Sequence, residues 1–193
     1  MPVYFLIQPF FFLITMIGVV PLAHGQPYLD RLPFAELTVT PPSTRVEGMP
    51  GALHVIDSSC RILPSSGVRR RIVDIAIQEW GFFGFNILDQ TSEFESSLRD
   101  AQRSQEARLS PRESVRLANS IAGYWSITPD GAWILRRQND VWNGPNGIAA
   151  RWRDPWSAAF VSWVMCEGGF GELNQFHRAI AHHVYIDQAI EAR

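Results

Sequence analysis

The chain has 193 residues, of which 46% are hydrophobic and 7 are tryptophan. This is enough apolar material for one folded domain with flanking segments, and it excludes a wholly disordered chain. The formal charge is −2 at pH 7, which argues against a nucleic-acid partner because phosphate binding needs a basic surface.

The first 25 residues carry no Asp, Glu, Lys or Arg and include an apolar run over residues 10–20. Ala23 and Gly25 place small residues just before Gln26, the pattern of a secretory signal peptide cleaved at that point. We therefore expect an exported protein, periplasmic or secreted, whose only membrane contact is this segment. The alternative is an uncleaved N-terminal anchor, because no basic residue precedes the apolar run. Both interpretations place the domain outside the cytoplasm.

Two cysteines, Cys60 and Cys166, occur in the chain. In an exported protein an even pair suggests a disulfide. Two unpaired cysteines, one of them in a buried helix, fit the sequence equally well. Both alternatives stay open, since the sequence does not show whether the two residues approach within bonding distance.

The segment before the domain, residues 26–66, is rich in Pro, Ser, Thr and Gly. This composition predicts a linker, with a short extended piece at residues 53–56. Apolar residues at helical spacing then predict a helix over residues 67–79. Glu79, at the end of that helix, is expected to be half-buried and paired with an arginine such as Arg116.

Start signals and periodicity predict the remaining elements. Ser110 and Glu113 form a capping box that predicts a helix through about Tyr124. A short strand is expected at residues 132–135. The last helix is expected from about residue 174 to the end of the chain.

A further helix is expected over residues 155–167, with Asp154 as its N-cap and Pro155 at its first position. Ser157 then lies in the first turn, where backbone N–H groups have no partner and the helix dipole favours negative charge. Thiol hydrolases hold their nucleophile in such a position, because a helix N-terminus stabilises a thiolate. Cys166 lies on roughly the opposite face and cannot replace Ser157 as the nucleophile.

A serine nucleophile needs an activating base nearby. His182 is the strongest candidate, and Tyr185 follows it one turn later; His54, His177 and His183 are the others. The spacing of histidines and cysteines matches no zinc site, and we expect no metal and no cofactor. The structural alternative makes Ser157 part of a core helix and His182 a residue that bonds a backbone carbonyl.

Tryptophans are numerous enough to form a binding cleft for a glycan or a peptide. The candidates are Trp125, Trp142, Trp152 and Trp156. The alternative is that these side chains belong to the core.

Four short blocks, at residues 75–80, 123–125, 155–165 and 181–186, resemble in this order the bacterial family called domain of unknown function 2272. The resemblance covers residues 68–193. Its most specific part is Pro155-Trp156-Ser157-Ala158-Ala159-Phe160.

This block in turn resembles the Trp-Cys-Ala-x-Phe-Val block of CHAP and NlpC-type cell-wall hydrolases. Those papain-like enzymes cleave amide bonds in peptidoglycan with a Cys at the start of a helix and a His on a later strand. The resemblance implies an α+β fold and puts their Cys at Ser157, where a hydroxyl does not ionise as a thiol does. No residue of the chain up to Arg193 matches their strand histidine. We therefore expect residues 67–193 to be the mostly α-helical N-terminal part of an incomplete domain.

The sequence predicts an exported bacterial cell-envelope protein whose partner is peptidoglycan or another envelope component. As an enzyme it would hydrolyse a peptidoglycan amide bond, with Ser157 and His182 as catalytic residues. The alternatives are a truncated inactive domain and a non-catalytic envelope or peptidoglycan binding module. The residues expected to bind the ligand are Trp125, Trp142, Trp156 and Tyr185.

Overall fold

The computed structural model describes residues 39–62, 67–85, 110–172 and 175–193. The expected signal segment, residues 1–25, lies outside these ranges. The described elements are the α-helices α2 (Val68–Phe82), α4 (Pro111–Ser126), α5 (Gly131–Trp142), α6 (Ser157–Gly168) and α7 (His182–Glu191), the 3-10 helices η1 (Pro42–Arg45) and η2 (Gly147–Ala149), and the strands β1 (Val46–Glu47) and β2 (His54–Val55). The described part is thus mostly helical with one two-stranded antiparallel sheet, consistent with a helix-rich or mixed fold.

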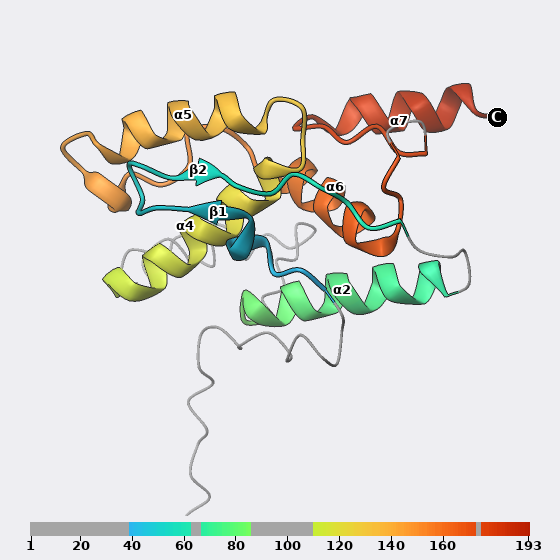
Figure 1. Cartoon of the computed structure of the whole chain (residues 1–193), viewed down its shortest axis with the longest axis horizontal. Helices are drawn as coiled ribbons and strands as arrows, with labels where there is room; N and C mark the ends of the chain where they lie inside the picture. The colour runs from blue at the N-terminus through green and yellow to red at the C-terminus, as the bar shows by residue number, and fades with distance from the viewer. Residues whose placement is uncertain (1–38, 63–66, 86–109, 173–174) are drawn as a thin grey trace, which may run out of the picture.

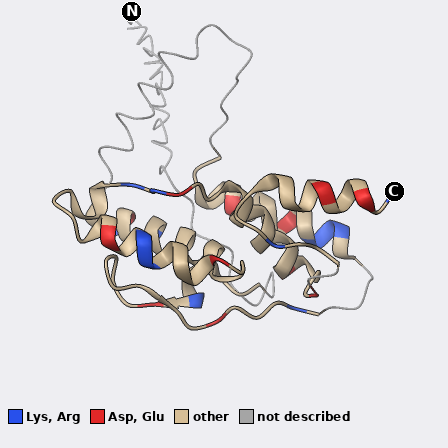
Figure 2. Cartoon of the chain, turned by 90° about the horizontal axis from the view of Figure 1, so that it is seen from above, with Lys and Arg blue, Asp and Glu red and all other residues tan. Residues whose placement is uncertain are grey.

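Helices α4 and α6 lie in the middle of the fold, with α5 on one side and α2 on the other (Figure 1). Helix α4 packs against η1, α5 and α6, and α2 packs against α6. The largest core side chains, at most 1% exposed, include Tyr124, Trp125 and Trp163. Acidic and basic residues are interspersed along the described ribbon (Figure 2). Within the described ranges, no helix is long and apolar enough to span a membrane.

The capping box at the start of α4 is confirmed. The Glu113 backbone N–H donates to Ser110 Oγ at 3.3 Å, and the Ser110 backbone N–H donates to Glu113 Oε2 at 3.0 Å. Hydrogen bonds from the Ser110 side chain and backbone lower the pKa of the Glu113 carboxyl. These contacts satisfy two N–H groups that a helix start otherwise leaves without partners, so α4 begins at Pro111 as the sequence predicts.

Residues 39–62 fall in the range expected to be a linker, yet the structure packs them against the helices. Val39, Val46 and Leu53 are buried in the core. The Asn139 side chain in α5 pairs with Leu53, accepting from its N–H at 3.1 Å and donating to its carbonyl at 2.7 Å. A segment rich in turns can be buried when neighbouring side chains satisfy its backbone in this way. Strand β2 lies within the extended piece expected at residues 53–56.

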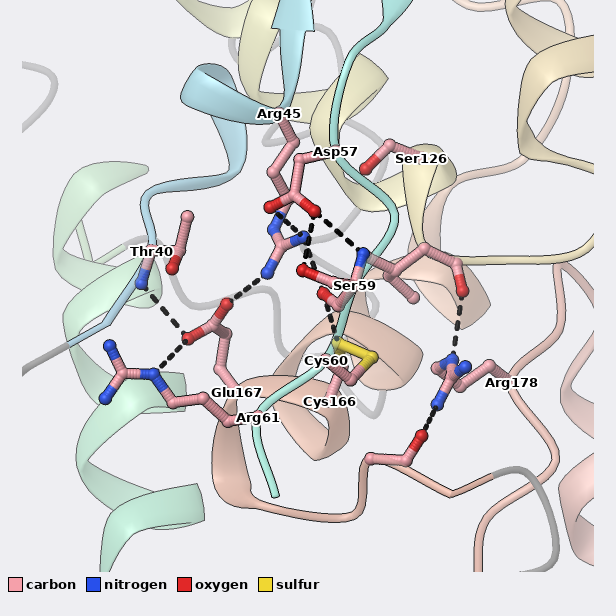
Figure 3. The surroundings of a disulfide bond; sticks show 12 residues. Thr40, Arg45, Asp57, Ser59, Cys60, Arg61, Ser126, Cys166, Glu167 and Arg178 are labelled. Carbon is pink, nitrogen blue, oxygen red and sulfur yellow. Dashed lines mark hydrogen bonds and ion pairs between the residues drawn. A yellow bond between two sulfur atoms is a disulfide. The ribbon is translucent and has the colours of Figure 1, made fainter. Parts of the chain in front are cut away.

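A buried ion-pair network ties this segment to α6 (Figure 3). The Arg45 guanidinium donates to Glu167 Oε1 at 2.5 Å, to Asp57 Oδ2 at 3.0 Å and to the Ser59 carbonyl at 2.8 Å. The Thr40 backbone N–H donates to the other Glu167 oxygen at 3.1 Å. A buried carboxylate and a buried guanidinium thereby satisfy each other, which is the condition for keeping both charges inside a protein.

A disulfide joins Cys60 to Cys166, next to this network (Figure 3). Their Cα atoms are 5.0 Å apart although 106 residues separate them in the chain. Of the two alternatives left open by the sequence, the structure has the bonded pair. The bond attaches residues 39–62 covalently to the C-terminal half of α6.

The prediction of a strand at residues 132–135 is wrong, because these residues belong to α5. Ile134, Leu135, Gln138 and Trp142 are buried along one side of this helix. Their spacing is helical, and the run of apolar residues at 132–135 is too short to separate a strand from a buried helix by pattern alone.

Helix α7 begins at His182, later than the expected start near residue 174. The segment before it is held by side chains of other elements. Ser162 Oγ in α6 accepts from the Ala179 N–H and donates to the Ala179 carbonyl, both at 3.0 Å. The Arg178 guanidinium donates to the carbonyls of Ile127 at 3.0 Å and Gly171 at 2.7 Å. Because the Ala179 N–H is bonded to a side chain, it does not join a helical ladder.

Candidate functional site

Helix α6 begins at Ser157, so the predicted cap at Asp154 and first turn at Pro155 are wrong. Asp154 Oδ1 lies 3.7 Å from Nη1 of Arg137, and the Pro155 carbonyl accepts from the Trp125 indole N–H at 3.3 Å. Trp156 occupies the N-cap position, and no side chain caps the helix. Ser157 is exposed, whereas Ala158 and Ala159 are at most 1% exposed, so the Ser157 N–H is the group of the first turn that a negatively charged atom can approach.

Ser157 and His182 are each the first residue of a helix, and the two helix starts meet. Ser157 Oγ lies 2.9 Å from His182 Nε2, a hydrogen-bonding distance. Both side chains are exposed. The bond between Ser162 and Ala179 holds the segment before α7 against α6, so the encounter of the two residues is fixed by the packing of their helices.

Tyr185 stands behind the histidine. Its hydroxyl is in hydrogen-bond contact with His182 Nδ1, and its ring stacks on Phe176 with centroids 5.0 Å apart. Burial raises the pKa of the Tyr185 hydroxyl above its ordinary value, so this group is neutral at physiological pH. When Nε2 accepts the Ser157 proton, Nδ1 carries the other hydrogen and donates it to the Tyr185 oxygen.

The three residues form a chain of hydroxyl, imidazole and phenol beside the uncapped start of α6. A nucleophile with a base in contact, and a third group that orients the base, is the arrangement of nucleophilic catalysis. The backbone N–H of Ser157 at the helix start can donate to a developing oxyanion. A neutral phenol orients the imidazole but gives its cation less support than a carboxylate would.

Residues 113–193 match the model of a family described as uncharacterized protein conserved in bacteria (DUF2272). The match supports a bacterial domain of unknown function in this stretch. It runs from the first turn of α4 through α7 and contains Ser157, His182 and Tyr185. No curated protein and no solved structure matches the chain.

The four tryptophans predicted to bind a ligand lie in the stretch that matches the family model, residues 113–193, which we call the DUF2272 region, and two of them are buried. Trp125 is 0% exposed and Trp142 is 4% exposed, so neither lines a cleft. Trp156 is half-buried and stacks on Phe83 with centroids 5.5 Å apart. Trp152 is also half-buried and lies edge-on to Trp142. Large aromatic rings bury much apolar area, which explains their place in the core.

The other candidate histidines lie elsewhere. His54 in β2 is exposed, with Nε2 3.7 Å from Glu47 Oε2. His177 and His183 are exposed, and the backbone N–H of His177 donates to Gln188 Oε1 at 2.7 Å. Within the described residues, no group of three His, Cys, Asp or Glu side chains could hold a metal ion.

Glu79 is 1% exposed, more deeply buried than the sequence predicts. It accepts a hydrogen bond from the Tyr124 hydroxyl of α4. Arg116, the expected partner, has its guanidinium over the Phe82 ring at 5.1 Å. The contact between Glu79 and Tyr124 joins α2 to the DUF2272 region.

Sequence reasoning missed the contact between Tyr185 and His182 and treated Tyr185 as a binding residue. The signal was present, because residues three apart on a helix are neighbours on its surface. The sequence also gave no indication of the outer face of α5, where Trp133 is 47% exposed. A large exposed aromatic residue is an informative observation, but only the structure provides it.

Proposed function

We propose that the protein is an exported bacterial envelope protein that hydrolyses an amide bond, with Ser157 as nucleophile and peptidoglycan as substrate. The observation that carries the chemistry is the 2.9 Å separation of Ser157 Oγ and His182 Nε2 at the uncapped start of α6. The apolar segment at residues 1–25 supports export. The resemblance of residues 155–160 to the block of CHAP and NlpC-type hydrolases supports the substrate class.

In the first half of the reaction, Ser157 Oγ attacks the carbonyl carbon while its proton passes to His182 Nε2. The carbonyl oxygen becomes an oxyanion that the backbone N–H of Ser157, at the start of α6, stabilises. His182 then returns the proton to the leaving amine, and an ester forms at Ser157.

In the second half, His182 Nε2 takes a proton from a water molecule that attacks the ester carbon. Collapse of the second tetrahedral intermediate releases the carboxylic acid, and Ser157 Oγ regains a proton from His182. Tyr185 holds the imidazole so that Nε2 faces Ser157 through both halves. The exposure of Ser157 and His182 gives a large polymer access to the pair.

The nucleophile is tested with a fluorophosphonate, which forms a phosphoester with an activated serine and releases fluoride. We expect labelling at Ser157, located by peptide mass spectrometry. Ser157→Ala should abolish the label, and His182→Ala should slow it by about a hundredfold or more. His183→Ala is the matched control, because it removes the adjacent exposed imidazole and should leave the rate unchanged. If Ser157 is not labelled, or if His182→Ala and the parent protein are labelled at equal rates, the assignment of Ser157 as the nucleophile is wrong.

The substrate class is tested by digesting purified sacculi with the full-length protein. Released muropeptides ending in new amine and carboxyl groups would support amide hydrolysis, and Ser157→Ala should release none. Labelling of Ser157 without muropeptide release would indicate that Ser157 acts by the same chemistry on another acyl compound. Binding to sacculi without labelling or release would favour the non-catalytic envelope module. Ser157→Cys would then test whether a thiol beside His182 supports hydrolysis.

A further inference from the structure

An open groove with a volume of about 500 Å³ runs along the outer face of α5, between this helix and the turn that joins β1 to β2. We call it the α5 groove, and it is lined by Gly51, Trp133, Arg136, Arg137, Asp140 and Asn143, together with Asn139. None of the three residues of the Ser157 site lines it. Helix α5 lies at the edge of the fold, beside β2 (Figure 1).

Trp133 provides a flat apolar surface at one end of the α5 groove. It is 47% exposed, although the core of this protein buries other tryptophans almost completely. The Arg137 guanidinium lies over its ring, 4.4 Å from the centroid, and fixes the orientation of the indole. An exposed and oriented aromatic ring is suited to stacking against the C–H face of a sugar ring.

The side of the α5 groove that faces the helix is held in place by hydrogen bonds to the side chains of Asn139 and Asn143. Asn143 Nδ2 donates to the Gly51 carbonyl at 2.7 Å, and the Asn139 side chain bonds both backbone groups of Leu53. Gly51 has a φ of +100°, and a Cβ there would lie 2.4 Å from Asn143 Oδ1. Glycine is therefore required for the turn to close on α5. A surface fixed in this way loses little conformational entropy when a ligand binds.

The charged residues that line the α5 groove are two arginines and one aspartate, and one of the arginines is paired with an aspartate outside the lining. Arg136 and Asp140 are both exposed, and Arg137 faces Asp154 with 3.7 Å between Nη1 and Oδ1. The guanidiniums donate hydrogen bonds, whereas the carboxylate of Asp140 and the amide oxygen of Asn143 accept them. A ligand that meets both kinds of group is one whose own groups both donate and accept. Hydroxyl groups do so, and a neutral ligand avoids repulsion from Asp140.

We propose that the α5 groove binds a neutral oligosaccharide segment of a polysaccharide chain. From Trp133 to Asn143 the helix extends over about 15 Å, a length that suits several sugar rings better than one. One ring stacks on Trp133, and the hydroxyls of the following rings meet Arg136, Asp140 and Asn143. This proposal is independent of catalysis at Ser157, because it uses different residues on a different helix.

The test is calorimetric titration of the full chain carrying Ser157→Ala, so that hydrolysis cannot consume a ligand. The probes are cellotetraose and chitotetraose, which differ only in their 2-hydroxyl and 2-acetamido groups. We expect one or both to bind with a millimolar or tighter Kd, and Trp133→Ala to weaken binding by about tenfold or more, the loss typical of removing an aromatic anchor. Trp80→Ala is the matched control, because Trp80 is 42% exposed on α2 and should not affect binding.

Arg136→Ala is a second variant that should also weaken binding. Arg136 is exposed, so this substitution is not expected to disturb folding. Binding by neither tetrasaccharide, or equal affinity for Trp133→Ala and its parent, would overturn the proposal. Binding of penta-alanine with the same dependence on Trp133 would overturn it in favour of a peptide. If saccharides bind but the fluorophosphonate does not label the wild-type protein, the α5 groove is supported and only the proposed catalysis at Ser157 is contradicted.

Discussion

Arg45 and Glu167 form a buried ion pair across 122 residues of sequence, with 2.5 Å between Nη2 and Oε1. Their side chains are 2% and 0% exposed. Glu167 is near the C-terminal end of α6, and Ser157 is the first residue of the same helix. The pair therefore fastens the helix that carries the candidate nucleophile to the segment formed by residues 39–62.

Breaking this pair should destabilise the protein strongly. We expect Glu167→Gln to lower the free energy of unfolding by about 3–5 kcal/mol, because it removes the buried carboxylate from Arg45 and leaves the 38% exposed Asp57 to balance the buried guanidinium. Denaturant unfolding followed by circular dichroism measures the change. The control is Arg70→Ala, which removes an exposed pair with Asp74 on α2 and should cost less than about 1 kcal/mol. If both variants lose the same free energy of unfolding, the buried pair stabilises the protein no more than an exposed pair does.

The disulfide between Cys60 and Cys166 should be present in the native protein. Non-reduced protein should be about 2 Da lighter than reduced protein, since each disulfide holds two fewer hydrogens. The double variant Cys60→Ala, Cys166→Ala should lose about 4–5 kcal/mol of unfolding free energy, because the bond closes a long loop in the unfolded chain. Two thiols reacting in denatured but unreduced protein would contradict the pairing.

Asp57 should make the protein less stable in acid. Burial alone would raise the pKa of its carboxyl, but hydrogen bonds from the Ser59 hydroxyl and N–H, with the charge of Arg45, outweigh burial and lower it. A carboxyl with a lowered pKa contributes its full stabilisation above its unfolded pKa of about 3.9 and loses it as the pH falls through the folded pKa. The unfolding free energy of Asp57→Asn should therefore decline less steeply than that of wild type below about pH 4. Parallel pH profiles for the two proteins would argue against this contribution.

Gly123 should not tolerate alanine, although alanine normally stabilises a helix interior by about 1 kcal/mol relative to glycine. A Cβ at Gly123 would lie 1.8 Å from the Pro42 carbonyl oxygen, where α4 packs against η1. We expect Gly123→Ala to cost about 3 kcal/mol or more, because the backbone of η1 must move. Thermal unfolding measures it, and Ala132→Gly, at an exposed position of α5, controls for helix propensity. A higher melting temperature for Gly123→Ala would show that the two segments are not in contact.

Tyr185 should act as a positioning residue for His182. Tyr185→Phe keeps the ring that stacks on Phe176 but removes the oxygen in contact with Nδ1. We expect fluorophosphonate labelling of Ser157 to slow by about tenfold, the value of one hydrogen bond, with an unchanged melting temperature. Phe176→Leu, which keeps the hydroxyl, should retain most of the rate. If labelling slows only as much as the loss of stability explains, Tyr185 has a structural role alone.

The sequence identified the two candidate catalytic residues, but it did not contain their geometry. The sequence predicts Ser157 in the first turn behind a cap at Asp154, but α6 begins at Ser157 itself and Asp154 lies beside Arg137. The distance from Ser157 to His182 depends on where α7 begins, which the bond between Ser162 and Ala179 decides. The tryptophans Trp125 and Trp142 are indistinguishable from exposed ones by sequence, since burial depends on which helices pack over them.

The sequence alone establishes the local features of the fold. The start of α4 and most of α2 could be predicted because the capping box and the helical spacing of apolar residues act within a few residues. Tertiary structure alone decided that residues 39–62 pack into the domain, that Arg45 meets Glu167 and that Cys60 reaches Cys166. The ion pair and the disulfide join positions more than 100 residues apart. Their formation depends on the whole chain burying its apolar surface together, which no local pattern encodes.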